Sequence, residues 1–191
     1  MKKISSALIS VFDKNKIENI CHILSNNDIE IYSTGGTFDY IKQLGIKIKK
    51  VEDLTSYPSI LNGRVKTLHP KVFGGILKTN SKSDLDESKK YEIPDIDLVV
   101  VDLYPFENTV KNSNNHEDII EKIDIGGVSL IRAAAKNYEN VVCISSKDQY
   151  DELISILNNG CKTDIGYRKK LAYAAFQKSS DYDYKISSYL G

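Results

Sequence analysis

The amino-acid sequence predicts an α/β fold of three layers, in which a mostly parallel sheet is flanked by helices. Short apolar segments alternate along the chain with segments whose apolar residues recur at helical spacing, and one apolar run is continuous enough for burial on both faces. Strands that alternate with helices are typically parallel, because each helix carries the chain back across the sheet. The length of 191 residues fits one such domain, or at most two small ones.

The predicted strands are short apolar segments that end at glycine or polar residues. The first reads as a buried strand, the second ends at Gly35 and Gly36, and the third alternates apolar with polar residues. The fourth contains the run LVVV, which indicates burial on both faces of a parallel sheet. The strands are expected at residues 5–12, 28–34, 46–51, 95–106 and 139–145.

The predicted helices show apolar residues at three- and four-residue spacing, as in 17–24. The second helix has Thr37 as its cap and Gly45 as its stop, whereas residues 52–80 show an irregular pattern. A Gly-Gly pair divides a later segment into two helices, and the last helix carries an apolar stripe that we expect to be partly an intersubunit face. The helices are expected at 16–27, 37–45, 81–93, 117–137, 147–159 and 167–190.

Charge and cysteine content exclude several classes of function. Lys and Arg together number 26, as do Asp and Glu, so no long-range field attracts nucleic acid or an anionic membrane. The N-terminus lacks the pattern of a secretory signal and no segment resembles a membrane span, so we expect a cytoplasmic protein. The three cysteines are widely spaced, Cys143 lies in an apolar run and is expected to be a buried, reduced thiol, and no Cys or His pair has metal-ligand spacing.

Unusual residues follow three of the predicted strands. Asp13 and Lys14 follow the first, STGGT (33–37) follows the second and DLYP (102–105) follows the fourth. Because ligands of parallel α/β sheets bind beyond the carboxyl ends of the strands, these residues mark a candidate site. STGGT could form a phosphate cradle from its glycine backbone and the following helix N-terminus, or simply a tight turn.

The loop NGRVKTLHPK (62–71) concentrates hydrogen-bond donors in a chain of zero net charge. If RVKT is extended, Arg64 and Lys66 point the same way, and Arg64 can bind a phosphate or carboxylate through two hydrogen bonds. Thr67 adds a hydroxyl group, and His69 is expected to be a structural hydrogen-bonding residue. The alternative is a solvated basic loop.

Four further side chains have two interpretations each. Asp102 needs a partner if it is buried, and Tyr104 could transfer a proton or complete the core. Asp124 precedes Gly-Gly and could be a helix cap or a catalytic carboxylate. Lys136 closes a helix, where a lysine favourably meets the C-terminal dipole.

Taken together and in this order, six motifs resemble the inosine monophosphate (IMP) cyclohydrolase domain of the bifunctional purine-biosynthesis enzyme. This domain belongs to the methylglyoxal-synthase-like superfamily. The resemblance implies that residues 1–191 form one IMP cyclohydrolase-like domain, with a C-terminal helix and with the transformylase domain absent. The motifs are SVFDK, STGGT, GRVKTLHP, DLYPF, DIGGVSLIRAAAKN and RKKLAYAAFQKSSDYDYKISSYL.

The resemblance implies a ring closure that converts 5-formamidoimidazole-4-carboxamide ribonucleotide to IMP with loss of water. It implies no cofactor and no metal, a small-molecule substrate supplied by a formyltransferase, and a homodimer. Two alternatives share part of the pattern: a methylglyoxal-synthase-like enzyme acting on a small phosphorylated sugar, and a regulatory module that binds a nucleotide. The first has no need for GRVKTLHP.

The resemblance also assigns roles to individual positions. Lys66, Tyr104, Asp124 and Lys136 match the residues around the reacting groups, with Lys136 as the proton shuttle and Asp124 as its partner. The positions matched to substrate binding are Phe12, Asp13, Lys14, Thr34, Gly35, Gly36, Thr37, Arg64, Val65, Thr67, Val101, Asp102 and Ile125.

Two positions depart from the family pattern, and one distance is long. Phe12 stands where serine is common, so a hydroxyl contact is missing, and Asp102 stands where asparagine is common. In a straight helix from Gly127, Lys136 would lie about 13 Å along the axis from the start. Asp124 and Lys136 could then meet only if the Gly-Gly segment folds back or the helix begins later.

Overall fold

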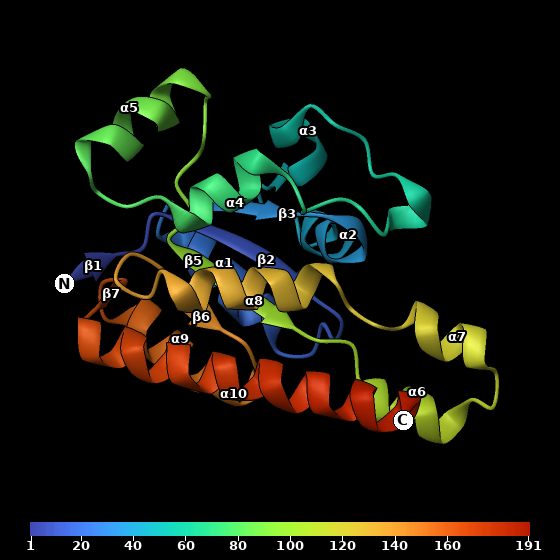
Figure 1. Ribbon diagram of the computed structural model, residues 1–191. Coiled ribbons are helices and arrows are strands. Elements are labelled where there is room, and N and C mark those ends of the chain that lie inside the picture. The colour runs from blue at the N-terminus through green and yellow to red at the C-terminus, as the bar shows by residue number, and fades with distance from the viewer.

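A five-stranded parallel sheet lies between two layers of helices in the computed structural model, which describes residues 1–191 (Figure 1). The strand order is β4-β3-β2-β5-β6, and all four neighbouring pairs are parallel. The predicted fold class is therefore confirmed, including the long C-terminal helix. The strands of this sheet are β2 (Ser6–Val11), β3 (Glu30–Ser33), β4 (Lys49–Lys50), β5 (Leu98–Asp102) and β6 (Val142–Ile144).

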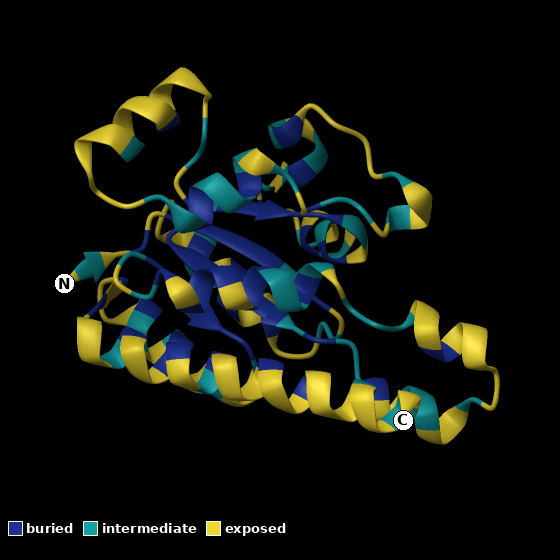
Figure 2. Ribbon diagram, in the orientation of Figure 1, coloured by how far each residue is buried: buried dark blue, intermediate teal, exposed yellow.

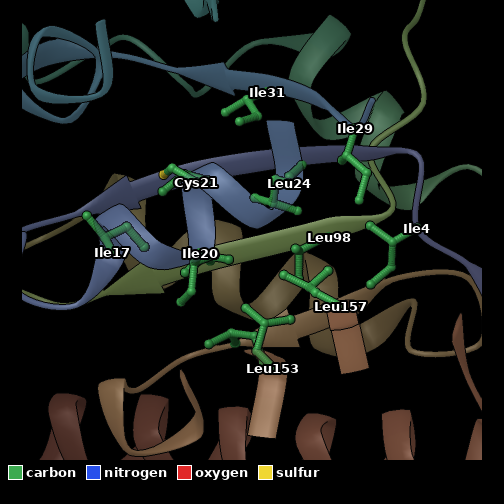
Figure 3. Close-up of a cluster of buried hydrophobic side chains, with 14 of the residues drawn as sticks. Ile4, Ile17, Ile20, Cys21, Leu24, Ile29, Ile31, Leu98, Leu153 and Leu157 are labelled. Carbon is green, nitrogen blue, oxygen red and sulfur yellow. The ribbon is translucent and has the colours of Figure 1, made fainter. Parts of the chain in front are cut away.

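Each face of the sheet carries its own hydrophobic core, because alternate residues of a strand point to opposite faces. In β5, Leu98 and Val100 join one cluster, whereas Val99 and Val101 join the other. Figure 3 shows side chains of the first cluster, which come from the sheet and from α1 (Ile17–Asn26) and α9 (Tyr150–Asn158). The continuous apolar run of the fourth predicted strand is thus buried on both faces, as expected.

Three helices cover the other face, and the longest of them continues past the edge of the sheet. One is α4 (Pro70–Leu77), whose Val72 and Ile76 join the second cluster. α8 (Gly126–Lys136) packs on β5 and β6, and α10 (Ile165–Leu190) packs along α8 (Figure 1). α10 buries one stripe that includes Leu171, Ala175 and Tyr182 and leaves its outer side exposed (Figure 2). The predicted apolar stripe therefore packs largely within the chain. None of the helices combines the length and apolar composition that a membrane crossing requires.

The expectation of irregular structure over residues 52–80 is wrong in part. This region holds α3 (Val51–Thr55), the short 3₁₀ helix η1 (Leu61–Gly63) and α4 (Pro70–Leu77). Gly74 and Gly75 obscured the helical pattern of α4, yet close packing explains them. A Cβ on Gly75 would lie 2.9 Å from the carbonyl oxygen of Pro94.

The remaining helices agree with the predicted order except α6 (Phe106–Asn112), which was not predicted; the strand expected at 95–106 ends at Asp102 instead. They are α2 (Gly35–Gln43), α5 (Lys82–Lys90), α6 (Phe106–Asn112), α7 (His116–Glu121) and η2 (Lys147–Gln149). α2 begins two residues earlier than expected, since Gly35 and Gly36 form part of its first turn and Thr34 takes the N-cap position. Thr37 is therefore not the cap.

A second, two-stranded antiparallel sheet joins the N-terminus to the segment before α10. It pairs β1 (Lys2–Lys3) with β7 (Lys162–Thr163). Next to it, the carboxylate of Asp97 accepts hydrogen bonds from the backbone N–H (2.9 Å) and hydroxyl (2.6 Å) of Ser5 and forms an ion pair with Lys2 (2.6 Å). These contacts fasten the first strand to the start of β5.

The strand order places a topological switch point between β2 and β5. From β2 the chain continues to β3 and β4 on one side, and it then returns to form β5 and β6 on the other. In open α/β sheets a ligand binds in the crevice beyond the carboxyl ends of the strands at such a point. The segments after β2, β3 and β5 are those that the sequence marked as candidates.

Candidate active site

Lys66 lies between the glycine segment after β3 and the segment before α8. Its Nζ is 3.4 Å from the place that a Cβ on Gly35 would occupy and 3.5 Å from the equivalent place on Gly63. Its charge also acts on Asp124, where it favours the carboxylate. A Cβ on either glycine would be in ordinary van der Waals contact with the ammonium group, so Lys66 lies directly against both glycine backbones.

Asp124 is fixed at the N-terminus of α8. Its Oδ1 accepts a hydrogen bond of 2.6 Å from the backbone N–H of Gly127, and its own N–H donates a 2.7 Å bond to the Tyr182 hydroxyl oxygen on α10. Burial raises the pKa of Asp124, while the N–H groups of Gly127 and Tyr104 and the charge of Lys66 oppose that rise. The two interpretations of Asp124 are thus compatible: it bonds the first turn of the helix and lies within range of the charge of Lys66.

The segment Thr34–Gly35–Gly36–Thr37 offers backbone amides rather than hydroxyl groups. Thr34 donates its hydroxyl to the carboxylate of Glu52 (2.9 Å). Thr37 uses its hydroxyl on the backbone of β2, accepting from Val11 N–H (3.2 Å) and donating to Val11 C=O (2.9 Å). The positive φ of Gly35 (55°) turns the chain into α2, a conformation that favours glycine. Of the donors in this segment, the amides at the start of α2 are therefore the ones available to an anion.

The loop after β2 is held by Asp102 at the end of β5. The carboxylate of Asp102 accepts the backbone N–H groups of Phe12 and Asp13 (3.1 Å for the latter), and burial raises its pKa against these two bonds. Lys14 folds back so that Nζ donates to the carbonyl groups of Val11 (3.1 Å) and Phe12 (2.8 Å). Nζ of Lys14 also lies 4.0 Å from the place of a Cβ on Gly36, beside the cradle.

Several other candidates lie around the same place. The hydroxyl of Thr67 is 3.2 Å from the place of a Cβ on Gly126, and the Tyr104 ring lies beside the Phe12 ring. Ile125 is exposed next to Asp124.

Two more candidates are already engaged in the fold, Val101 through its side chain and Val65 through its backbone N–H and C=O, which both bond to Ile60. Val101 points its side chain into a core cluster, and Val65 forms an isolated bridge with Ile60.

Two predicted residues do not point into this cluster. Arg64 is exposed and holds Glu121 on α7 through both carboxylate oxygens (2.7–3.1 Å). Its backbone is helical, not extended, so Arg64 and Lys66 do not point the same way as expected. Lys136 is exposed at the other end of α8, ten residues after Gly126. That separation is about 15 Å along the axis, so Lys136 and Asp124 of one chain do not meet.

The structure also shows partners that sequence reasoning missed. Glu52, Glu121, Lys147 and Tyr182 each bind a candidate residue, and each is 18 or more residues away from it in sequence. Only Tyr182 carried a signal, because it belonged to the predicted apolar stripe of the last helix. The expected structural role of His69 is confirmed, since its Nδ1 accepts the N–H of Lys71 at the start of α4.

An open groove of about 540 Å³ lies beside Lys14, bordered by residues of α1 and by Tyr40 of α2. Lys14 is the one member of the predicted site that lines it. The groove thus extends the surface next to the cradle without containing Lys66 or Asp124.

Comparison with known proteins places this geometry in a family. Residues 16–129 match the MGS-like domain, and residues 134–191 match the AICARFT/IMPCHase bienzyme family. The chain is 52% identical over 190 residues to the bifunctional purine biosynthesis protein PurH of Bacteroides thetaiotaomicron. It is 47% identical over 184 residues to the PurH protein of Clostridioides difficile.

The two PurH proteins are much longer than this chain. The alignments cover 98% and 96% of the chain but only 38% and 36% of those proteins. A solved structure, that of ForH, matches over 95% of this chain and 94% of its own, with 34% identity and a TM-score of 0.84. The chain therefore belongs to the MGS-like domain family and is a homologue of part of the PurH proteins.

Proposed function

We propose that this protein is an IMP cyclohydrolase. It would close the pyrimidine ring of 5-formamidoimidazole-4-carboxamide ribonucleotide to give IMP and water. One observation carries the proposal: Lys66 lies close enough to act on the charge of Asp124, beside the glycine segment at the start of α2, in a chain that is 52% identical to a PurH protein. An ammonium, a buried carboxylate and a phosphate-binding turn are the groups that this reaction requires.

The proposed chemistry uses both side chains on one substrate. The carboxamide nitrogen attacks the formyl carbon, and a proton leaves that nitrogen as the new C–N bond forms. Asp124 is suited to accept this proton, since burial raises its pKa above the ordinary value of an aspartate. Lys66 stabilises the formyl oxygen as it gains charge and gives it a proton. The new hydroxyl then leaves as water with the proton held by Asp124, while the former formamide nitrogen gives its proton to Lys66 as the ring C=N bond forms.

Binding would place the two reacting groups of the substrate next to each other. The phosphate would lie on the amides at the start of α2, with Lys14 supplying charge. The carboxamide and formyl groups are already on one molecule, so much of the acceleration comes from orientation. Tyr104 fits a role at the reacting groups, because its N–H interacts with the Asp124 carboxylate.

We further propose that the protein acts as a homodimer in which Lys136 serves the site of the partner. Lys136 and Arg132 share one face of α8, and the Arg132 guanidinium lies over the exposed Phe176 ring of α10 (5.7 Å). Tyr173 and Tyr184 extend this exposed aromatic face along α10.

In a two-fold dimer each subunit offers the same surface, so two α8 helices would pair antiparallel. Such pairing brings the far end of one α8 toward the start of the other. Lys136 of one chain would then lie near Asp124 of its partner, which resolves the separation found within one chain.

The substrate would come from a formyltransferase, because its formyl group must be added before the ring can close. We propose the cytoplasm as the place of action. The three free cysteines are buried, which fits a protein that needs no disulfide.

The test of the activity is a ring-closure assay followed by ultraviolet absorbance, with the formamido ribonucleotide as substrate. Wild-type protein should form IMP, and Lys66→Met should lower turnover by about 100-fold. Its affinity for IMP should remain within about tenfold of wild type, as only the transition state depends on this proton. A folded wild-type protein that binds IMP without turnover would instead support the regulatory alternative.

The shared site is tested by mixing two inactive variants. Lys66→Met and Lys136→Ala should each be nearly inactive alone, whereas subunit exchange should restore about a quarter of wild-type turnover through one intact site per mixed dimer. Mixed dimers would retain two defective sites if Lys136 acted within its own chain. No recovery, with exchange confirmed by mass spectrometry, would therefore rule out the shared site.

A further inference from the structure

Phe12 is an exposed aromatic residue in the candidate active site. It follows β2 directly and is 44% exposed, while the residues just before it are buried in the sheet. Its ring lies 4.2 Å from the Tyr104 ring, centroid to centroid, at an interplanar angle of 48°. Tyr104 therefore supports one side of the Phe12 ring, and the other side faces solvent.

The backbone of Phe12 is held in place from both directions. Its N–H donates to Asp102, and its C=O accepts a 2.8 Å hydrogen bond from Lys14 Nζ. The next N–H, that of Asp13, also donates to Asp102 (3.1 Å). Three hydrogen bonds, to the side chains of Asp102 and Lys14, therefore fix the backbone that carries this exposed ring.

The ring lies between the anion-binding groups and the reacting groups. Lys14, beside Gly36, contacts the Phe12 carbonyl, while Tyr104 contacts the Phe12 ring and places its N–H near Asp124. The Tyr104 ring is itself covered by the Lys122 ammonium at 4.8 Å. Of the two rings, Phe12 is thus the one that is free to receive a ligand.

We propose that Phe12 is a specificity-determining residue, on whose open face the aromatic heterocycle of a ribonucleotide stacks. This inference rests on the proposed function. Stacking needs only a π-face, so the ring would select a planar heterocycle joined to a ribose phosphate and would ignore a phosphorylated sugar without one. The phosphate cradle alone makes no such distinction.

The test compares two ligands that share the ribose phosphate and differ in the heterocycle. Calorimetry measures binding of IMP and of ribose 5-phosphate to wild type, Phe12→Ala, Phe12→Leu and Phe12→Tyr. Phe12→Ala should weaken IMP binding about 5- to 100-fold, the range found for loss of one base stack. Ribose 5-phosphate should bind all four proteins within about twofold of each other, because the cradle is unchanged.

The two other variants separate aromaticity from apolar surface. Phe12→Tyr should keep IMP affinity, whereas Phe12→Leu should lose most of it despite its similar apolar area. Tyr91→Ala serves as the matched control, because Tyr91 is 54% exposed at the end of α5, outside the site, and should leave both affinities unchanged.

Four results would overturn the inference, and the measurements distinguish them from one another. Equal weakening of both ligands by Phe12→Ala would mean that the loop has moved, and unchanged IMP binding would mean that Phe12 does not stack. A variant with wild-type IMP binding but an altered oligomeric state by light scattering would make Phe12 an intersubunit contact. Failure of wild type to bind IMP would remove the proposed function together with the stack.

Discussion

Replacing Gly127 with alanine should damage catalysis far more than stability. A Cβ on Gly127 would lie 2.9 Å from Cγ of Asp124, whereas ordinary contacts begin at 3.4 Å, so the carboxylate must retreat by at least about 0.5 Å. The 2.6 Å hydrogen bond from Gly127 N–H would lengthen or break. Both effects act on the one carboxylate that we propose as the base.

The expected change in stability is small because two effects oppose each other. Alanine is favoured over glycine in a helix by up to about 1 kcal/mol. A hydrogen bond to a charged group contributes about 1.5–3 kcal/mol. The free energy of unfolding should therefore fall by about 0.5–2 kcal/mol in urea titrations followed by circular dichroism. A displacement of this size in an active site can cost about 100-fold in turnover.

The pH dependence gives a second readout. The Gly127 N–H favours the ionised form of Asp124, so its loss should raise the pKa of this carboxyl further. The acid limb of the pH–rate profile should move to higher pH, since the base must be deprotonated to act.

Gly166→Ala is the matched control for this substitution. Gly166 lies in the first turn of α10, and a Cβ there would lie 3.2 Å from Oδ1 of the capping residue Asp164. The local change is similar, but no proposed catalytic group is involved. Gly127→Ala protein with normal turnover and an unshifted acid limb would refute the assignment of Asp124 as the base.

Three further substitutions test the framework around the site. Arg168→Met should cost about 3 kcal/mol or more in urea unfolding, because the buried guanidinium donates to three backbone carbonyl groups that would lose their partners. Glu52→Gln should raise the affinity for inorganic phosphate about two- to fivefold in calorimetry, since it removes a negative charge bound to Thr34 beside the cradle. Burial alone would raise the pKa of Asp97. The hydrogen bonds from Lys2 and Ser5 outweigh that effect and hold the pKa below its ordinary value. A lowered carboxyl pKa contributes stability that is lost as pH falls below about 4, so Asp97→Asn should flatten that acid loss in urea titrations at successive pH values.

The sequence predicted the order of the elements because each strand and helix carries its own local pattern. The run at 98–101 had to be buried on both faces, and the spacing in α1 allowed only one buried side. The sequence did not predict α4, because Gly74 and Gly75 weaken its helical pattern. Glycine is needed at both positions because the helix packs directly against the segment before β5. β1 and β7 have two residues each, too few for any period to appear.

The location of the site followed from strand ends, whereas the direction of its side chains did not. Lys66 and Asp124 both lie at the carboxyl edge of the sheet. Each precedes a helix, α4 or α8, that carries the chain back across the parallel sheet to its next strand. The side chain of Arg64 points toward Glu121. The two residues are 57 positions apart, so no local sequence pattern could have predicted this contact. Threonine is a common helix cap, but the hydroxyl of Thr37 instead donates a hydrogen bond to the backbone C=O of Val11 in β2.

The hydrogen bond between Asp124 N–H and the Tyr182 hydroxyl has a consequence for the order of biosynthesis. During translation the loops after β2, β3 and β5 emerge from the ribosome well before position 182 does, so the nascent chain carries a cradle without a finished base. Catalytic activity would then appear only when the last helix, α10, packs against α8. Pulse-labelled intermediates released before that point should bind phosphate but show no ring-closure activity.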